Sequence, residues 1–246
     1  MCNNTLEDLQ CGGMKIYQDK DGFRFGTDAV LLADFAKGCR AKTALDLCTG
    51  SGIVPILLAA KTRLEKICGI ELQHKAAELA QKSVSLNGLD NRVFIREGDL
   101  KNCLDFYQKR SFDMITCNPP YMKSGAAIVN ESDAKVIARH EVKCSLDDVI
   151  YAASVLLKVG GRFFMVHRPT RAAEVIAAMS RYKIEPKRLR FVHPDPKSEP
   201  VLFLIEGLIF GGSELRVMPP LFLKDENGSE SAELAAIYGR RIEEKD

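Results

Sequence analysis

Residues 43–61 read TALDLCTGSGIVPILLAAK, and this stretch decides the fold. Its first five residues are mostly apolar and predict a short buried strand. The turn CTGSG (residues 48–52) follows, and residues 53–61 then predict a helix. A strand, a glycine turn and a helix in this order open a nucleotide-binding βαβ unit, because the glycines let backbone come close to a ligand. The strict dinucleotide fingerprint is absent, since Cys48 stands where a first glycine often does, and no phosphate-loop Gly-Lys-Ser/Thr follows.

Acidic residues follow the next two predicted strands. Residues 66–70 predict the second strand, and Glu71 ends it at a spacing of about 20 positions beyond the glycines, which suits the paired hydroxyls of a ribose. An ordinary charge at a helix start is the alternative interpretation of Glu71. Residues 93–96 predict a third strand, after which Asp99 could accept a hydrogen bond from an exocyclic amine or could be a plain turn aspartate.

Residues 111–121, SFDMITCNPPY, predict a strand that stops at two prolines. Asn118 is left at the carboxyl end of this strand, where open α/β sheets bind ligands. Its side-chain carbonyl and the backbone carbonyl of Pro119 are neighbouring acceptors that suit a planar amine or amide NH₂, and Tyr121 offers a face for stacking. A strand-ending turn with a buried tyrosine is the structural alternative.

Composition excludes several classes of protein. The chain has 246 residues, of which 46% are hydrophobic and 28% charged, so a sizeable core is expected and wholesale disorder is not. The net charge of +2 neither demands nor excludes nucleic acid. The eight cysteines form no C-x-x-C pair, which favours reduced thiols over zinc or disulfides. An acidic amino terminus and the lack of an apolar run of about 20 residues argue against a signal peptide or a membrane span, so we expect a cytoplasmic protein with no metal.

The remaining chain predicts one domain, with residues 1–40 as a segment covering the cofactor and substrate, 41–210 as the core sheet and 211–246 as a carboxyl-terminal extension. Residues 1–13 are expected to be a loose leader. Thr27 or Asp28 should cap a helix that ends at Ala36. Phe23 and Phe25, which flank an arginine before that cap, could line a ligand site or could be a staple on the core.

The segment after the prolines, residues 122–144, is charged and without periodicity, which is typical of a lid or binding loop. The sequence beyond it predicts alternating helices and strands, and the last two strands should be antiparallel because their connection is too short for a helical crossover. The expected elements are a helix at 145–158, a turn at 160–161, a strand at 162–166, a helix at 171–182, strands at 186–192 and 201–210, and a helix at 231–241.

Together these features resemble the class I S-adenosylmethionine-dependent methyltransferases. The resemblance implies an α/β fold with a seven-stranded, mostly parallel sheet, one antiparallel strand and helices on both faces. It also implies S-adenosylmethionine as the cofactor. The implied cofactor-binding residues are Phe25, Thr27, Asp46, Cys48, Gly50, Gly52, Glu71, Asp99 and Asn118.

The NPPY motif of residues 118–121 matches methyltransferases that act on amino or amide nitrogen. Residues 23–32 (FRFGTDAVLL) and 138–141 (ARHE) are similar to the bacterial tRNA1(Val) adenine-37 N6-methyltransferase family. This resemblance implies N6-methylation of adenine 37 in the anticodon loop of a tRNA. The implied catalytic residues are Asn118, Pro119, Pro120 and Tyr121, and the implied substrate-binding residues are Tyr121, Lys123, Arg139 and His140.

Three alternatives remain open at this stage. An N5-glutamine methyltransferase acting on a protein would use the same two acceptors, although those enzymes usually carry an extra amino-terminal helical domain, and the first sheet strand here is expected at residue 43. A guanine-N2 RNA methyltransferase carries a close variant of the motif. A non-catalytic RNA-binding module could retain the fold. The oligomeric state is left undetermined.

Overall fold

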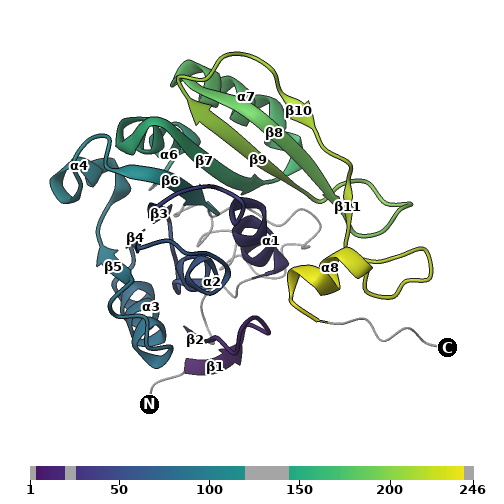
Figure 1. Cartoon of the computed structure of the whole chain (residues 1–246), viewed down its shortest axis with the longest axis horizontal. Coiled ribbons are helices and arrows are strands. Elements are labelled where there is room, and N and C mark those ends of the chain that lie inside the picture. The colour runs from purple at the N-terminus through teal and green to yellow at the C-terminus, as the bar shows by residue number, and fades with distance from the viewer. Residues whose placement is uncertain (1–3, 20–25, 120–143, 241–246) are drawn as a thin grey trace, which may run out of the picture.

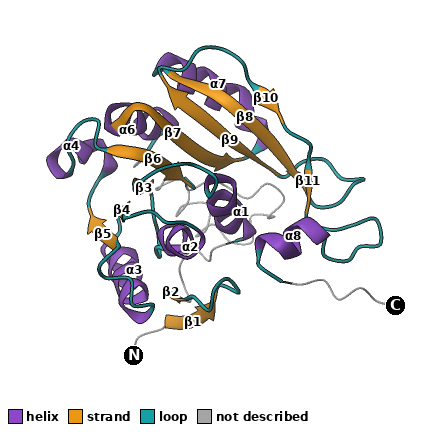
Figure 2. Cartoon of the chain, viewed as in Figure 1, coloured by secondary structure: helices purple, strands orange, loops and turns teal. Residues whose placement is uncertain are grey.

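The computed structural model describes residues 4–19, 26–119 and 144–240, and within them a central sheet carries helices on both faces (Figure 1). Figure 2 shows the same arrangement by type of element. The strands are β1 (Asn4–Asp8), β2 (Lys15–Asp19), β3 (Thr43–Leu47), β4 (Lys66–Glu71), β5 (Val93–Glu97), β6 (Phe112–Cys117), β7 (Leu157–His167), β8 (Ile184–His193), β9 (Leu202–Ile209), β10 (Arg216–Val217) and β11 (Leu221–Phe222). The helices are α1 (Thr27–Ala36), α2 (Ile53–Lys61), α3 (His74–Leu86), α4 (Cys103–Phe106), α6 (Leu146–Leu156), α7 (Ala172–Arg181) and α8 (Ala232–Ile237), with 3₁₀ turns η1 (Leu100–Asn102) and η2 (Pro169–Arg171).

The sheet has the order β10-β8-β9-β7-β6-β3-β4-β5, with β11 also paired to β8. Neighbours from β5 to β7 run parallel, while β9 is antiparallel to both β7 and β8. The mostly parallel α/β sheet with one antiparallel strand is therefore confirmed. The expected count of seven strands is wrong for the described residues, because β10 and β11, of two residues each, extend the sheet at β8 to nine strands.

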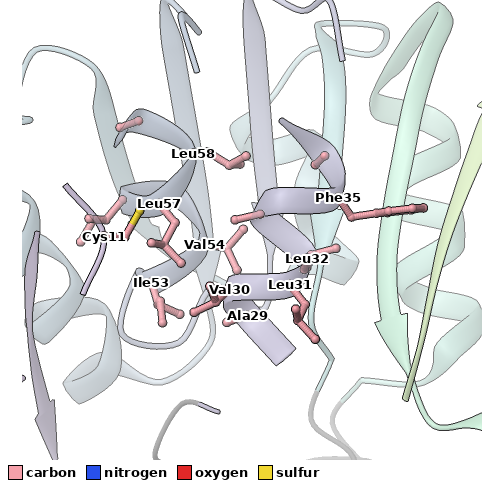
Figure 3. Packing of buried hydrophobic residues seen from close by; sticks show 14 of the residues in the cluster. Cys11, Ala29, Val30, Leu31, Leu32, Phe35, Ile53, Val54, Leu57 and Leu58 are labelled. Atoms are coloured by element: carbon pink, nitrogen blue, oxygen red, sulfur yellow. The ribbon is translucent and has the colours of Figure 1, made fainter. Parts of the chain in front are cut away.

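Side chains alternate between two apolar cores, one on each face of the sheet. On one face, Ala44 of β3 and Met114 of β6 pack under α1 and α2. Figure 3 shows this layer, in which apolar side chains of α1 and α2 interdigitate above the strands. On the other face, Leu45 and Ile115 lie beneath α6 and α7. Helices cover both faces of the central strands, so a ligand can reach these strands only at their ends.

Most helices lie where the sequence predicts them. Helix α2 begins and ends at the predicted residues. Ser145 caps α6 as expected, in a capping box with Asp148, although the helix ends at Leu156 rather than at residue 158. The cap of α1 is neither Thr27 nor Asp28: Gly26 is the cap residue, and Asp28 accepts from the Gly26 and Ala29 amides at 3.2 and 2.9 Å. The Asp28 carboxylate therefore satisfies the free amides from inside the first turn.

The expected turn at residues 160–161 is wrong. Gly160 and Gly161 do not form a turn before a strand but lie inside β7, which starts five residues earlier than predicted, at Leu157. The register of β6 and β7 shifts between Phe112 and Met114, so an irregularity absorbs the glycines.

The supposed leader contains β1, which forms an antiparallel hairpin with β2. Polar side chains of α3 and its cap hold the free edge of β2: Ser83 Oγ accepts from Tyr17 N at 2.9 Å, and Oδ1 of the cap residue Asn87 accepts from Lys15 N at 3.0 Å. The hairpin depends on contacts with a helix about 70 residues away, which local sequence does not reveal. No described helix has the length and apolar character needed to cross a bilayer.

Candidate functional site

The candidate site lies at the carboxyl edge of β3, β4, β5 and β6. These strands are parallel and adjacent, so the residues that follow them meet at the same edge of the sheet. The structure thereby brings together residues that are far apart in sequence. The predicted site residues at this edge are Cys48, Gly50, Gly52, Glu71, Asp99 and Asn118.

The turn after β3 has three residues in the left-handed region. Cys48, Gly50 and Gly52 have φ values of 57°, 55° and 81°. Among the described residues, no atom would lie within 4 Å of a Cβ at Gly50, so none of them fills the space above this residue. Gly52 is confined differently, because a Cβ there would lie 3.0 Å from Cβ of Ala80. Cys48 adopts a backbone conformation that costs a non-glycine residue about 1 kcal/mol or more.

Glu71 is buried at the end of β4 and holds the turn in place. Its side chain is 6% exposed. Oε2 accepts from Gly50 N at 2.8 Å, and Oε1 accepts from Gln73 N at 2.9 Å. A carboxylate offers about four lone-pair sites, so each oxygen retains an acceptor site for a ligand hydroxyl. Glu71 therefore joins the glycine turn to the start of α3 and presents acceptors beside the open space at Gly50.

Asp46 is buried on β3, where both carboxylate oxygens bind hydroxyls of the chain. Oδ2 accepts from Thr49 Oγ1 at 2.7 Å, and Oδ1 accepts from Thr116 Oγ1 at 2.6 Å. Burial raises the pKa of Asp46 to about 7, an effect that the two hydrogen bonds only partly offset and to which the Glu71 charge adds. Its contact with a cofactor stays a prediction, whereas its link between the glycine turn and β6 is present in the fold.

Asp99 and Thr27 flank this edge. Asp99 Oδ1 accepts from Lys101 N at 2.9 Å and caps η1, which is the plain turn role considered for it, while its second oxygen lies 3.6 Å from Lys101 Nζ. Thr27 opens α1. Figure 3 places Ala29 and Val30 of α1 beside Ile53, the first residue of α2, so the amino-terminal ends of both helices lie on the same side of the molecule. The predicted ligand contacts of Asp99 and Thr27 stay predictions.

Asn118 follows β6 directly, and Pro119 after it is buried. Asn118 Oδ1 is buried, and within the described part of the chain it accepts no hydrogen bond. A buried carbonyl oxygen without a donor carries a desolvation cost of about 1–3 kcal/mol, which a ligand NH would remove. Asn118 is therefore an acceptor that the fold leaves available.

Three thiols gather at the same edge. Cys48 interacts with the thiols of Cys117 and Cys144. The hydrogen bond with Cys117 and burial raise the pKa of Cys48 well above its usual value, although the hydrogen bond with Cys144 acts in the opposite direction. Burial likewise raises the pKa of Cys117. All seven cysteines in the described ranges are free of disulfides. These thiols are neutral packing groups and poor nucleophiles at neutral pH.

Several predicted site residues lie outside the described residues, namely Phe25, Pro120, Tyr121, Lys123, Arg139 and His140. Sequence reasoning also missed two residues of the site, Thr49 and Thr116, whose hydroxyls bind Asp46. One signal was available for Thr116, since it is a polar residue on the same strand face as the core residue Met114.

Comparisons with known proteins agree with this geometry. The methyltransferase small domain family matches residues 20–183. A protein of Porphyromonas gingivalis named tRNA1(Val) (adenine(37)-N6)-methyltransferase is 30% identical over 189 residues, which cover 74% of this chain and 73% of that protein. A protein of the same name from Aeromonas salmonicida is 29% identical over 170 residues, covering 69% of this chain and 70% of that protein.

Solved structures support the fold. A predicted O-methyltransferase, Atu636 from Agrobacterium tumefaciens, superposes with a TM-score of 0.71 at 21% identity, covering 89% of this chain and all of that one. TYW2 of P. horikoshii in complex with MeSAdo superposes with a TM-score of 0.60 at 15% identity, covering 86% of this chain and 73% of that one. At these identities the likeness concerns the fold alone. The family match spans two thirds of the chain and contains the whole glycine turn, Glu71 and Asn118, and the chain belongs to the methyltransferase small domain family.

Proposed function

We propose that this chain is an S-adenosylmethionine-dependent methyltransferase that modifies N6 of an adenine in tRNA. The observation that carries the proposal is the buried Asn118 carbonyl oxygen, which accepts no hydrogen bond within the described residues and stands at the carboxyl end of β6. Relatives at about 30% identity carry the name of a tRNA adenine-N6-methyltransferase, which supports the same activity and the same class of substrate.

The residues at the edge of the sheet fit S-adenosylmethionine. The cofactor has a ribose with two hydroxyl donors, and Glu71 offers a buried carboxylate with acceptor sites left on both oxygens. None of the described residues fills the space next to the Gly50 α-carbon, so a ligand can approach the backbone there. Asp99, one strand further, would accept from the adenine amine of the cofactor. When bound, S-adenosylmethionine supplies an electrophilic methyl group on its sulfonium.

The chain's own residues would orient the substrate amine. The lone pair of an adenine N6 is delocalised into the ring, so the amine is a poor nucleophile. The Asn118 oxygen and the Pro119 carbonyl would accept its two hydrogens and favour a pyramidal nitrogen. Acceptor dipoles at this place also stabilise the positive charge that grows on nitrogen during transfer. Alignment of two bound reactants contributes much of the acceleration.

The finer substrate is adenine 37, in the anticodon stem-loop. An unpaired loop base is cheaper to extrude than a base in a duplex, and proteins that read RNA favour splayed bases. Tyr121 would stack on this base, while Lys123, Arg139 and His140 would hold the flanking RNA. The chain would act in the cytoplasm as a single domain, with residues 1–40 covering the cofactor and the substrate.

A base-resolved comparison of tRNA from cells with and without this protein tests the proposal. The expected result is loss of one N6-methyladenosine from a tRNA anticodon loop, restored by the wild-type chain and not by Asn118→Ala. Loss of N2-methylguanosine, or an unchanged tRNA profile with loss of a methylated protein glutamine, would refute it. Binding of tRNA and of cofactor without methyl transfer would instead indicate a non-catalytic module.

A further inference from the structure

Asp46 is a buried acid that side-chain hydroxyls hold, whereas buried Glu206 is paired with Arg162 and Arg188. Asp46 is 2% exposed, and its two donors among the described residues are threonine hydroxyls, at 2.7 and 2.6 Å. Among the described residues it takes part in no salt bridge. A buried carboxylate without a cation depends strongly on each hydrogen bond that it accepts. Loss of either hydroxyl therefore changes the charge state of the group as well as its position.

The two hydroxyls come from the two halves of the site. Thr49 lies in the glycine turn, one residue before the Gly50 amide that donates to Glu71. Thr116 lies on β6, two residues before Asn118. Asp46 and Thr116 are direct partners in the parallel register of β3 and β6, so their side chains point to the same face. A chain of three side chains thus runs from the cofactor turn to the strand that presents the acceptor.

The packing around these side chains fixes their direction. Thr116 is fully buried and Thr49 is 3% exposed. A Cβ on Gly69 of β4 would lie 2.9 Å from Thr49 Oγ1 and 3.0 Å from its Cγ2, so Thr49 fills the space that this glycine leaves. The Thr49 amide also donates to the Ile70 carbonyl at 3.0 Å. Both threonines are thus packed inside the fold with their hydroxyls on Asp46, which links the turn to β6.

We propose that Thr116 and Thr49 are positioning residues that act through ionised Asp46 to hold the cofactor turn and Asn118 at the distance that methyl transfer requires. This inference rests on the proposed function. Ionised Asp46 accepts from both hydroxyls at once, whereas protonated Asp46 carries a hydrogen on one oxygen and no longer holds both threonines as an acceptor. The titratable groups that interact with it are Glu71 from β4 and Cys117 from β6. The Cys117 thiol stays neutral because burial raises its pKa, so Glu71 is the charge that opposes ionisation of Asp46.

Thr116→Val is the decisive variant because it removes the hydroxyl and keeps the shape. We expect kcat for tRNA methylation to fall about tenfold or more, while the dissociation constant of S-adenosylhomocysteine changes less than about threefold, since Thr49 still holds the turn. The acid limb of the kcat profile should move to higher pH, because ionised Asp46 loses a donor. Thr116→Ser restores the hydroxyl, so it should restore kcat and return the acid limb of the kcat profile to its wild-type pH. Thr49→Val should shift the same acid limb of the kcat profile. It should also weaken S-adenosylhomocysteine binding, which calorimetry across pH measures.

Thr43→Val is the matched control. Thr43 Oγ1 donates to Asp113 Oδ2 at 2.9 Å between the same two strands, but at their amino-terminal end. This variant should lower the melting temperature and leave the acid limb and S-adenosylhomocysteine binding unchanged. If Thr116→Val keeps kcat and the wild-type limb, or if Thr43→Val moves the limb equally, the inference is overturned. If Thr116→Val does not fold, an unmoved limb in Thr49→Val overturns it. A wild-type chain that binds S-adenosylhomocysteine with the expected pH dependence but methylates no tRNA would refute the proposed function alone.

Discussion

Replacement of Glu71 by glutamine isolates the charge at the end of β4. The side chain keeps its length, but one acceptor oxygen becomes an NH₂ that faces a backbone amide. The wild-type carboxylate accepts from Gly50 N at 2.8 Å and from Gln73 N at 2.9 Å. Hydrogen bonds to a charged acceptor contribute about 1.5–3 kcal/mol each, and one of the two is lost in Glu71→Gln. We therefore expect the free energy of unfolding to fall by about 2–3 kcal/mol.

Cofactor affinity should fall for the same reason. A neutral amide oxygen accepts from a ribose hydroxyl less strongly than a carboxylate does, by about 1–2 kcal/mol, which corresponds to a dissociation constant about 5- to 30-fold higher. Calorimetry with S-adenosylhomocysteine and thermal unfolding of the same preparation measure both effects.

Glu97→Gln is the control for this experiment. Glu97 is the register partner of Glu71 on β5, yet its side chain is 51% exposed and contacts the exposed His74 ring at 2.7 Å. Its replacement should change stability by less than about 0.5 kcal/mol and leave cofactor binding unaltered. If Glu71→Gln binds S-adenosylhomocysteine within about twofold of wild type, Glu71 does not hold the ribose, and the reasoning from buried acceptors fails.

Three further variants test other parts of the fold. Asn118→Ala should lower kcat about 10²-fold with little change in stability or S-adenosylhomocysteine affinity, and near-normal initial rates would make residues 118–119 a structural turn. Gly69→Ala adds a methyl 2.9 Å from Thr49 Oγ1, so the melting temperature and cofactor affinity should both fall, whereas Gly38→Ala, with no atom within 4 Å of the new carbon, should do neither. Burial alone would raise the pKa of Asp113, but hydrogen bonds from Lys158 and the Thr43 backbone lower it to about 2, so its stabilisation is present above about pH 4 and is lost as pH falls toward 2. Asp113→Asn should therefore flatten the acid side of the stability profile in denaturant titrations, and an unchanged slope would contradict this assignment.

The stretch around Cys48 shows which features local sequence can predict and which it cannot. Strand, glycine turn and helix were readable at residues 43–61 because glycine, β-branched and apolar residues act on their own backbone within a few positions. The left-handed backbone of Cys48, at φ 57°, was not readable from its residue type, because only the surrounding turn imposes it on a non-glycine residue. Strand β1 was missed for a similar reason, since the hairpin that it forms with β2 is held at the edge of β2 by Ser83 of α3 and by Asn87, which caps that helix.

By itself, the sequence determined the α/β class and the order in which strands, turns and helices alternate along the chain. It also identified the polar residues at the carboxyl ends of three strands, namely Glu71 at β4, Asp99 after β5 and Asn118 after β6. Those features follow from periodicity, capping and turn chemistry, which act between near neighbours. Only the tertiary structure decided that Thr49 and Thr116 share one carboxylate and that Asn118 has a buried, available oxygen. The physical reason is register: Thr116 reaches Asp46 across 70 residues because β3 and β6 pair at that position, and a shift of one residue would turn the hydroxyl to the opposite face of the sheet.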